Sequence, residues 1–283
     1  MNLSNYIDGI AKKSEQSIPL EMGDYLGDDG LYYCHKCDTP KQVKVKNPFI
    51  VGRYDIRHCL CKCRIEKKER EEAERRRAEF EKRVKEYRRM GFPESDMQNW
   101  TFANDDGSNE KIMSAMKNYV ANFDDLLKQG KGLLLFGTVG TGKTYAAACI
   151  ANALIDKGCP VLMTDFVRIA NTVGGMFEGK QEYYDSLNRF PLLILDDLAA
   201  ERKTEYMQEI VYNVIDSRYR AGLPLIVTTN LTSEELKHPS DISYQRTFSR
   251  LLEMCLPVKV EGKDKRLEKL KSDIQPMKDL LGL

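Results

Sequence analysis

The sequence has almost no excess of charge of either sign. Its 283 residues include 44 Lys and Arg and 43 Asp and Glu, which give a formal net charge of +1. A protein that held nucleic acid through its overall charge would be clearly basic. The composition therefore excludes a uniformly basic protein, and any nucleic-acid-binding surface must be local.

The sequence also lacks a long apolar run. No segment approaches the roughly 20 apolar residues that a membrane-spanning helix needs. The first residues, MNLSNYIDGIAKKSEQ, contain no apolar core of the kind found in signal peptides. We therefore expect a cytoplasmic protein that makes no membrane contact.

No internal repeat is evident, and composition divides the chain into three zones. Residues 1–63 hold a cysteine cluster and turn-rich segments. Residues 64–90 are rich in Arg, Lys and Glu without Gly or Pro, which predicts a solvated helix ~40 Å long. An apolar seam along this helix consists of Ala73, Phe80, Val84 and Tyr87. The seam is either incidental or packs on a neighbouring element. Residues 91–283 are long enough to form a domain with its own core.

The third zone alternates short apolar runs with helical patterns, which is typical of an α/β fold with a parallel sheet. We expect strands at residues 133–136, 161–164, 192–195, 225–228 and 256–260. A helix is predicted after Thr204, a suitable N-cap, and its apolar stripe consists of Met207, Ile210, Val211, Val214 and Ile215.

A glycine-rich loop follows the first predicted strand. Gly137, Gly142, Lys143 and Thr144 fit the pattern G-x-x-x-x-G-K-[ST] between a strand and a helix. Such a loop points backbone N–H groups at phosphate oxygens, while its Lys neutralises the β and γ phosphates and its Thr holds Mg²⁺. A plain glycine turn is the much weaker alternative. We expect nucleotide contacts from Gly137, Thr138, Val139, Gly140, Thr141, Gly142, Lys143, Thr144 and Tyr145.

Two further strands end in polar side chains. In PLLILDDLAA, Asp196 is expected to share the magnesium ion with Thr144, and Asp197 to orient or deprotonate the attacking water. In LPLIVTTN, Asn230 would reach the γ-phosphate or that water if its strand lies between the other two. Taken alone, these residues would be read as helix caps or turn formers. Behind the glycine-rich loop they indicate hydrolysis rather than passive binding.

The linked segments GTVGTGKT, LLILDDL, YNVIDSRYRAGLPLIVTTNLT and RTFSRLLEMC resemble AAA+ ATPases, in particular DnaC/DnaI-type replicative helicase loaders and IstB-like proteins. The resemblance covers about residues 100–262. It implies an AAA+ P-loop NTPase core with a five-stranded parallel sheet, in which the strand before Asn230 lies between the P-loop strand and the acidic strand. It also implies a zinc-binding domain at 1–63, a charged helical linker at 64–90 and the ATPase domain at 91–283.

The same resemblance assigns arginines. RTFSRLL matches the arginine-finger region, with Arg250 as the finger and Arg246 as the alternative, and a finger that acts in trans implies self-association. Surface salt bridges are the ordinary role of two such arginines. Arg266 stands where the family carries a second sensor, although the chain ends too soon for the usual helical lid. Asp197 replaces the more common Glu, and the shorter side chain suits slow hydrolysis that depends on oligomer and DNA.

Five of the eight cysteines lie between Cys34 and Cys63, which favours a metal site over disulfides. The resemblance favours Cys34, Cys37, Cys61 and Cys63 as zinc ligands, because the family's amino-terminal domains often show C-x-x-C followed by C-x-C. Cys59 and His58 remain alternates, and unmetallated surface thiols are the other interpretation. The remaining cysteines, Cys149, Cys159 and Cys255, are expected to be core residues.

Aromatic and basic residues alternate between the second and third predicted strands, where they could stack bases and contact phosphates of single-stranded DNA or simply belong to the core. These residues are Arg168, Phe177, Lys180, Tyr183, Tyr184 and Arg189. In the resembling loaders the zinc domain docks on the hexameric helicase and the ATPase domain engages single-stranded DNA.

The sequence therefore predicts an ATPase that uses ATP, Mg²⁺ and Zn²⁺ and loads a replicative helicase onto single-stranded DNA. An IstB-like transposition ATPase is the nearest alternative. A nucleotide or small-molecule kinase would need an acceptor pocket and a basic lid that the sequence does not show, and a non-catalytic zinc adaptor would not need an intact P-loop.

Overall fold

The computed structural model describes residues 20–198, 204–239 and 242–282. The prediction that the chain lacks a signal peptide concerns residues outside these ranges. The chain forms two compact units, Met1–Glu79 and Phe80–Leu283, and the division between them falls inside a long helix. Within the described residues, no helix combines the length and the apolar character needed to cross a membrane.

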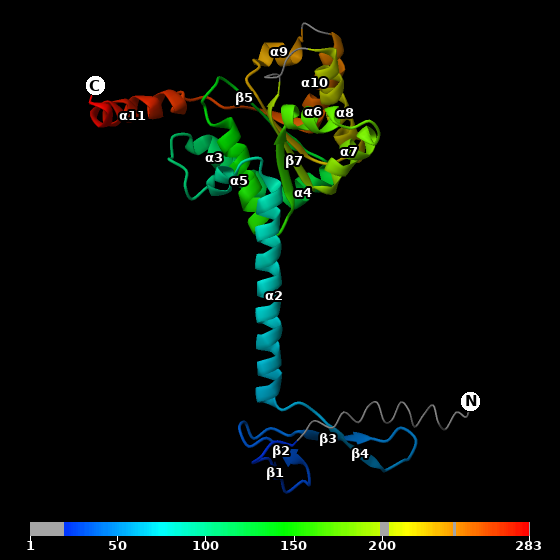
Figure 1. The fold of residues 1–283 in the computed structure, drawn as a ribbon. Coiled ribbons are helices and arrows are strands. Elements are labelled where there is room, and N and C mark those ends of the chain that lie inside the picture. The colour runs from blue at the N-terminus through cyan, green and yellow to red at the C-terminus, as the bar shows by residue number, and fades with distance from the viewer. Residues whose placement is uncertain (1–19, 199–203, 240–241, 283) are drawn as a thin grey trace. The chain divides into compact units, whose positions relative to one another are not determined.

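The first unit consists of two small antiparallel ribbons (Figure 1). β1 (Tyr25–Leu26) pairs with β2 (Tyr32–Tyr33), and β3 (Gln42–Lys46) pairs with β4 (Tyr54–His58). Its buried apolar residues are few among those described, namely Leu31, Cys34 and Cys61. So small a core cannot account for folding without a further stabilising element.

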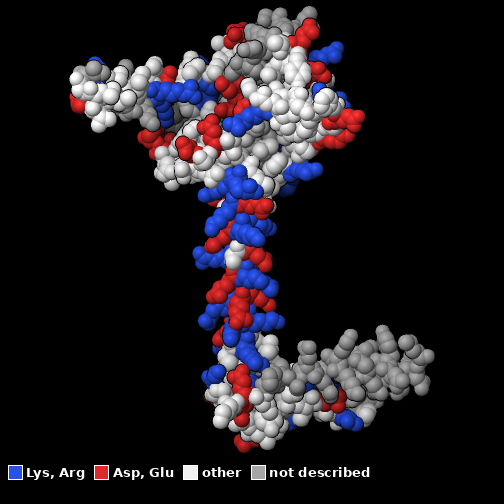
Figure 2. All heavy atoms as spheres, viewed as in Figure 1, with Lys and Arg blue, Asp and Glu red and all other residues white. Residues whose placement is uncertain are grey.

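The predicted charged helix is confirmed as α2, Lys62–Gly91. Figure 2 shows acidic and basic side chains interleaved along it, and four of its ion pairs have the i,i+4 spacing that supports a solvated helix. The apolar seam is used in its second half only. Val84 and Tyr87 pack against the core of the second unit, whereas Ala73 is exposed.

The second unit is built on a five-stranded parallel sheet with the order β6-β7-β8-β5-β9. Its strands are β5 (Gly132–Phe136), β6 (Val161–Asp165), β7 (Leu192–Leu198), β8 (Leu225–Thr229) and β9 (Cys255–Lys259). All five strands predicted from the sequence are confirmed. β8 lies between β5 and β7, so the polar residues at the ends of these three strands meet at one edge.

Helices cover both faces of this sheet (Figure 1). Alternate strand residues divide between two apolar clusters: Leu133 and Leu135 of β5 belong to one cluster, and Leu134 and Phe136 to the other. The first cluster includes α3 (Glu110–Ala121) and α5 (Lys143–Asp156), and the second includes α6 (Phe166–Gly174), α8 (Glu205–Ala221) and α10 (Ile242–Met254). The remaining elements are η1 (Ser95–Asn99), α4 (Phe123–Gln129), α7 (Lys180–Ser186), η2 (Leu187–Arg189), α9 (Ser233–Lys237) and α11 (Lys265–Leu281).

Helix α8 begins as predicted. The Thr204 side chain accepts a hydrogen bond from the backbone N–H of Met207, and the predicted stripe is buried from Ile210 onward. No local pattern predicts that Arg218, on the same helix, is fully buried. Its guanidinium donates hydrogen bonds to the carbonyls of Phe190, Pro191 and Pro224, and so fastens the chain just before β7 and β8.

The isolated cysteines behave as expected. Cys149 and Cys255 are buried in the two apolar clusters, and Cys159 packs beside the first. Burial raises the pKa of the Cys149 thiol to about 12, which keeps it neutral and unreactive.

Candidate nucleotide-binding and metal sites

A cavity of about 350 Å³ opens at the carboxyl edge of the sheet, next to the glycine-rich loop. That volume suits a small-molecule ligand, and the position is the usual one for ligands of open α/β sheets. Its lining comes from several distant segments: Trp100, Asn104, Asp106, Val139, Gly140, Gly142, Lys143, Thr144, Tyr145, Asp196, Asp197, Asn230, Lys265 and Arg266.

The loop between β5 and α5 needs its glycines. Gly140 and Gly142 have φ angles of 78° and 91°, a region that side-chain-bearing residues rarely adopt. A Cβ atom on Gly140 would lie 2.0 Å from a carboxylate oxygen of Asp264, so a side chain there would displace that carboxylate. The loop therefore holds its backbone close to the first residues of α5, where the N–H groups and the helix dipole favour an anion.

Lys143 is held inward. Its Nζ donates to the carbonyls of Gly137 and Thr138 at 2.9 and 2.7 Å, and to Oδ1 of Asn230 at 2.8 Å. Burial lowers the pKa of Lys143, while the nearby Asp197 and Asp196 oppose this shift. The lysine is thus a partly desolvated cation with only neutral hydrogen-bond acceptors, which favours binding of an anionic phosphate.

The acidic residues after β7 occupy different environments. Asp196 is half-buried, and its carboxylate accepts a hydrogen bond from Thr228 Oγ1 at 2.6 Å. Burial raises the pKa of Asp196, and hydrogen bonds from Thr228 and Thr144 oppose that shift. A carboxylate in contact with the P-loop Thr144 hydroxyl has the position that a magnesium ligand requires, so the residues fit Mg²⁺.

Asp197 lies at a bulge in β7. Its φ is 59°, in the left-handed region, and the register between β7 and β8 shifts between Leu195 and Leu198. The backbone N–H of Asp197 donates to Thr228 Oγ1 at 2.9 Å. This conformation turns the Asp197 side chain into the cavity instead of leaving it on the face opposite Asp196.

Asn230 connects the lysine to this carboxylate. Its Nδ2 donates to Oδ1 of Asp197 at 3.0 Å, while its Oδ1 accepts from Lys143 at 2.8 Å. A phosphate that binds Lys143 competes with Asn230 for the same ammonium group. The position of Asn230, and through it Asp197, is therefore sensitive to what occupies the loop.

The structure brings most of the predicted nucleotide and catalytic residues to one place. Val139, Gly140, Gly142, Lys143, Thr144, Tyr145, Asp196, Asp197 and Asn230 line the cavity, as does Arg266. Gly137 and Thr138 accept hydrogen bonds from Lys143, and Thr141 stabilises the loop through a bond to the Thr138 carbonyl.

Four other residues that line the cavity were not predicted from the sequence. Trp100 lies 5.9 Å from the Tyr145 ring, measured between ring centroids, which provides an aromatic wall for a base. Asn104 follows it in the same segment. Lys265 pairs with Asp106 at 2.9 Å, which ties the start of α11 to the opposite rim of the cavity. No local pattern marks these residues, because only the tertiary fold brings them to the loop.

Arg250 does not belong to this cavity within one chain. It forms an ion pair with the buried Asp216, and its guanidinium lies 5.1 and 5.5 Å from the ring centroids of Tyr212 and Tyr219. Arg246, one turn earlier on α10, is exposed. The role of Arg250 as a finger therefore stays a prediction, and the structure adds the residues that hold it.

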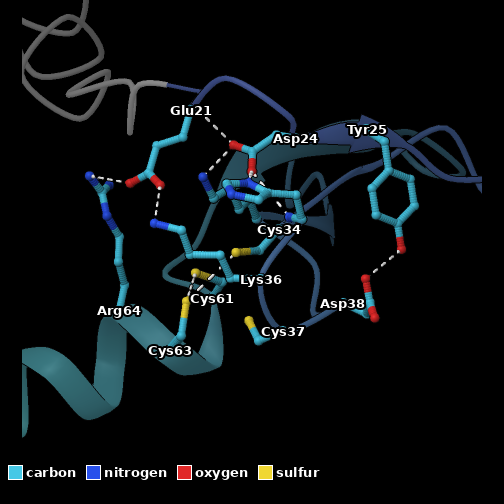
Figure 3. Close-up of polar contacts among 12 residues, drawn as sticks. Glu21, Asp24, Tyr25, Cys34, Lys36, Cys37, Asp38, Cys61, Cys63 and Arg64 are labelled. Carbon is cyan, nitrogen blue, oxygen red and sulfur yellow. Dashed lines mark hydrogen bonds and ion pairs between the residues drawn. The ribbon is translucent and has the colours of Figure 1, made fainter.

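The four favoured cysteines are brought together in the first unit (Figure 3). Their Sγ atoms all lie within 4.8 Å of one another, and Cys34 and Cys61 are buried. Thr39 lowers the pKa of the Cys37 thiol to about 6, whereas the neighbouring thiols raise that of Cys63 to about 12. Four converging sulfurs that cannot ionise together without a cation fit a tetrahedral zinc ion.

The two alternates are placed elsewhere. Cys59 Sγ points to the Pro40 carbonyl at 3.5 Å, and His58 lies exposed on β4. Neither belongs to the group of four sulfurs.

For Tyr184 the structure supports the core alternative. Tyr184 is only 4% exposed and packs in the second apolar cluster, so its ring cannot stack on a base. Phe177 in the same segment is fully exposed and remains a candidate. Arg168 pairs with Asp165, which caps the start of α6.

Comparisons with known proteins agree with this geometry. The profile of the family described as IstB-like ATP binding protein matches residues 64–272. The replicative helicase loader DnaI of Bacillus subtilis is 27% identical over 209 residues, which are 68% of this chain and 66% of DnaI. An insertion sequence ATP-binding protein of Sinorhizobium fredii is 34% identical over 116 residues, 39% of this chain and 38% of that protein.

These alignments span less than two thirds of the length of either relative. Among solved structures, the crystal structure of DnaI matches 60% of this chain and 96% of the solved chain, with a TM-score of 0.50 and 24% identity. At this identity the structural likeness shows the fold.

Proposed function

The chain belongs to the family of IstB-like ATP binding proteins, and from that premise we propose that it is an ATPase that loads a replicative helicase onto single-stranded DNA. The observation that carries the ATPase assignment is the contact chain from Lys143 through Asn230 to Asp197 at the edge of the sheet. These hydrogen bonds link the ammonium group of Lys143, which would bind phosphate, to the carboxylate of Asp197, for which no other role is evident.

ATP would bind with its phosphates on the loop from Gly137 to Thr144 and its base beside Trp100 and Tyr145. Magnesium would be held by Thr144 and Asp196 and would neutralise charge on the phosphates. Asp197 would orient the attacking water as a general base, with Asn230 fixing its carboxylate.

We assign the trans-acting arginine to Arg250, which implies that hydrolysis is completed between two copies of the chain. Asp216, Tyr212 and Tyr219 fix the guanidinium within its own chain. Because these contacts already order the guanidinium, Arg250 loses less conformational entropy when two copies assemble.

We assign residues 1–63 to a zinc domain, 64–90 to a helical linker and 91–283 to the ATPase domain. The zinc ligands would be Cys34, Cys37, Cys61 and Cys63. The zinc domain is the proposed docking module for the hexameric helicase, and the ATPase domain the module that engages single-stranded DNA. Support for these partners comes from the likeness to DnaI.

A transposition accessory ATPase is the second candidate, and the relative from Sinorhizobium fredii supports it. The two functions share the ATPase domain and differ in partner. A pull-down with full-length protein in the presence of ATP distinguishes them. Recovery of a hexameric helicase supports the loader, and recovery of a transposase replaces it with the second candidate.

The matched control for the pull-down is Cys61→Ser, which removes one of the two buried sulfurs. A helicase that binds through a zinc-dependent domain should be lost from this variant while ATP binding persists. A helicase that is still recovered with Cys61→Ser contradicts docking through the zinc domain.

A further inference from the structure

The hairpin β3–β4 of the first unit stands out because its surface combines basic side chains with exposed aromatic and aliphatic ones. Within residues 42–58 the basic side chains are Lys44, Lys46, Arg53 and Arg57, and the one acidic residue is Asp55. From the sequence alone this charge could not be interpreted, because acidic residues precede it.

Among the acidic residues that the structure describes before the hairpin, all but the exposed Asp28 are already engaged. Asp24 pairs with Lys41 and His35. Glu21 pairs with Lys36 and Arg64 (Figure 3). Asp29 accepts hydrogen bonds from the Leu31 N–H and the Tyr33 hydroxyl, and Asp38 accepts one from Tyr25. These acids therefore neutralise cations of the zinc region or accept local hydrogen bonds.

The bases of the hairpin are left outside these pairs. Lys46 and Arg57 have no ion-pair partner among the residues that the structure describes. Lys44 Nζ donates to the Asp29 carbonyl at 2.6 Å, and its charge also helps to lower the pKa of the Asp29 carboxyl. Arg53 alone is paired, with Asp55 at 3.6 Å. The hairpin thus carries a local excess of positive charge on a chain whose net charge is only +1.

The register places two of these lysines on one face with an aromatic ring. Lys46 pairs across the strands with Tyr54, and Lys44 with Ile56. Directly opposed residues share a face of a two-stranded ribbon. Tyr54 and Ile56 are 54% and 53% exposed, so this lysine face is open to a ligand.

The tip of the hairpin presents a second ring. Phe49 is 91% exposed, and its position is fixed because Asn47 Oδ1 accepts hydrogen bonds from the backbone N–H groups of Phe49 and Ile50 at 2.9 and 3.1 Å. An exposed aromatic ring on a backbone held in this way, in the same hairpin as the lysines, is suited to stack on an unpaired base.

We propose that the β3–β4 hairpin is a binding site for single-stranded nucleic acid that works without ATP. Lys44 and Lys46 contact phosphates, and Tyr54 and Phe49 stack on bases. Charge complementarity and exposed rings favour an unpaired strand over a protein partner. This site goes beyond the proposed function, which places the strand on the ATPase domain.

The test uses full-length protein carrying Lys143→Ala, without nucleotide, so that binding by ATP-assembled protein does not contribute. Fluorescence anisotropy measures binding of a labelled oligodeoxythymidine of about 20 nucleotides, longer than the roughly 4–16 nucleotides that one compact module occupies. The titration is repeated between about 50 and 200 mM salt.

The double variant Lys44→Ala/Lys46→Ala should reduce the magnitude of the slope of log affinity against log salt by about 1.4, because each of the two lost phosphate contacts contributes about 0.7. Its matched control, Lys67→Ala/Lys68→Ala, removes the same charge from α2 and should leave the slope unchanged. Tyr54→Ala should weaken binding roughly tenfold, and Tyr54→Phe should bind like the parent protein.

Three results would overturn the site. One is no detectable binding of the oligonucleotide by the parent protein, and another is an equal change of slope in both double lysine variants. The third is unaltered oligonucleotide binding by the hairpin variants together with loss of helicase capture, which would assign the hairpin to a protein partner. Each leaves the ATPase assignment untouched, because that assignment depends on residues of the other unit.

Discussion

Removal of the Asn230 side chain tests the contact chain that underlies the ATPase assignment. Asn230→Ala deletes the 2.8 Å bond from Lys143 and the 3.0 Å bond to Asp197. Hydrogen bonds to charged groups contribute about 1.5–3 kcal/mol each, and the exposure of Asn230 and Asp197 places these at or below the lower limit.

The two lost bonds act on different steps. Lys143 keeps its bonds to the Gly137 and Thr138 carbonyls, so ATP should bind Asn230→Ala about as well as the parent protein. Asp197 loses the amide that fixes its carboxylate, and a misplaced general base costs on the order of 100-fold in rate. The expected result is near-normal affinity with turnover reduced about 100-fold.

The assay measures ATP affinity by equilibrium binding and the chemical step by single-turnover hydrolysis. Asn118→Ala, on the exposed surface of α3, is the matched control and should change neither quantity. Asn230→Asp places a carboxylate against Asp197 and an anion on Lys143, so it should weaken both binding and hydrolysis. Wild-type turnover by Asn230→Ala would refute the reasoning, as would a loss of ATP affinity equal to that of Lys143→Ala.

Other predictions concern the remaining site residues. Lys143→Ala should abolish ATP binding, whereas Asp197→Asn should retain binding and lose turnover; equal loss of binding in a filter assay would contradict their separate roles. Arg250→Ala should lower ATPase activity only where the protein is assembled, because the finger acts on the neighbouring copy. Mixing this variant with Lys143→Ala protein should restore some ATPase activity, and a mixture without activity argues against a finger in trans. Chelation should release one zinc ion per chain and unfold the first unit without loss of ATP binding; metal analysis with circular dichroism and an ATP-binding assay checks this, and loss of ATP binding on chelation would contradict it.

The nucleotide cavity was predictable where its chemistry is local in sequence. The P-loop residues from Gly137 to Thr144 follow a strand directly and lie within one short segment, so the pattern alone predicts their position. Asp196 could be placed because the carboxyl ends of parallel strands share one edge. The position of β8 between β5 and β7 could not be deduced from spacing along the chain. The family resemblance predicted it.

Residues that depend on tertiary contacts were missed. Trp100 and Lys265 reach the cavity from opposite ends of the ATPase unit, and their local sequence has no periodicity that reports this. Strand alternation alone would point Asp196 and Asp197 to opposite faces, and the bulge that turns Asp197 toward Asn230 is not marked in the sequence.

Helical faces explain why both roles stayed open for Tyr184 in the sequence. Tyr183 and Tyr184 are adjacent, so they project about 100° apart on α7, and composition cannot tell which faces the core. The structure buries Tyr184 and leaves Tyr183 half-exposed. Arg250 was singled out by resemblance, but its partner Asp216 lies on another helix and carries no motif.

The most direct test of the account measures transfer of a hexameric helicase onto circular single-stranded DNA by the purified protein with ATP. The account predicts efficient transfer by the parent protein and none by Lys143→Ala, whose loop cannot hold the triphosphate. Transfer by Lys143→Ala at the parent rate would contradict the claim that ATP bound in this cavity drives the function.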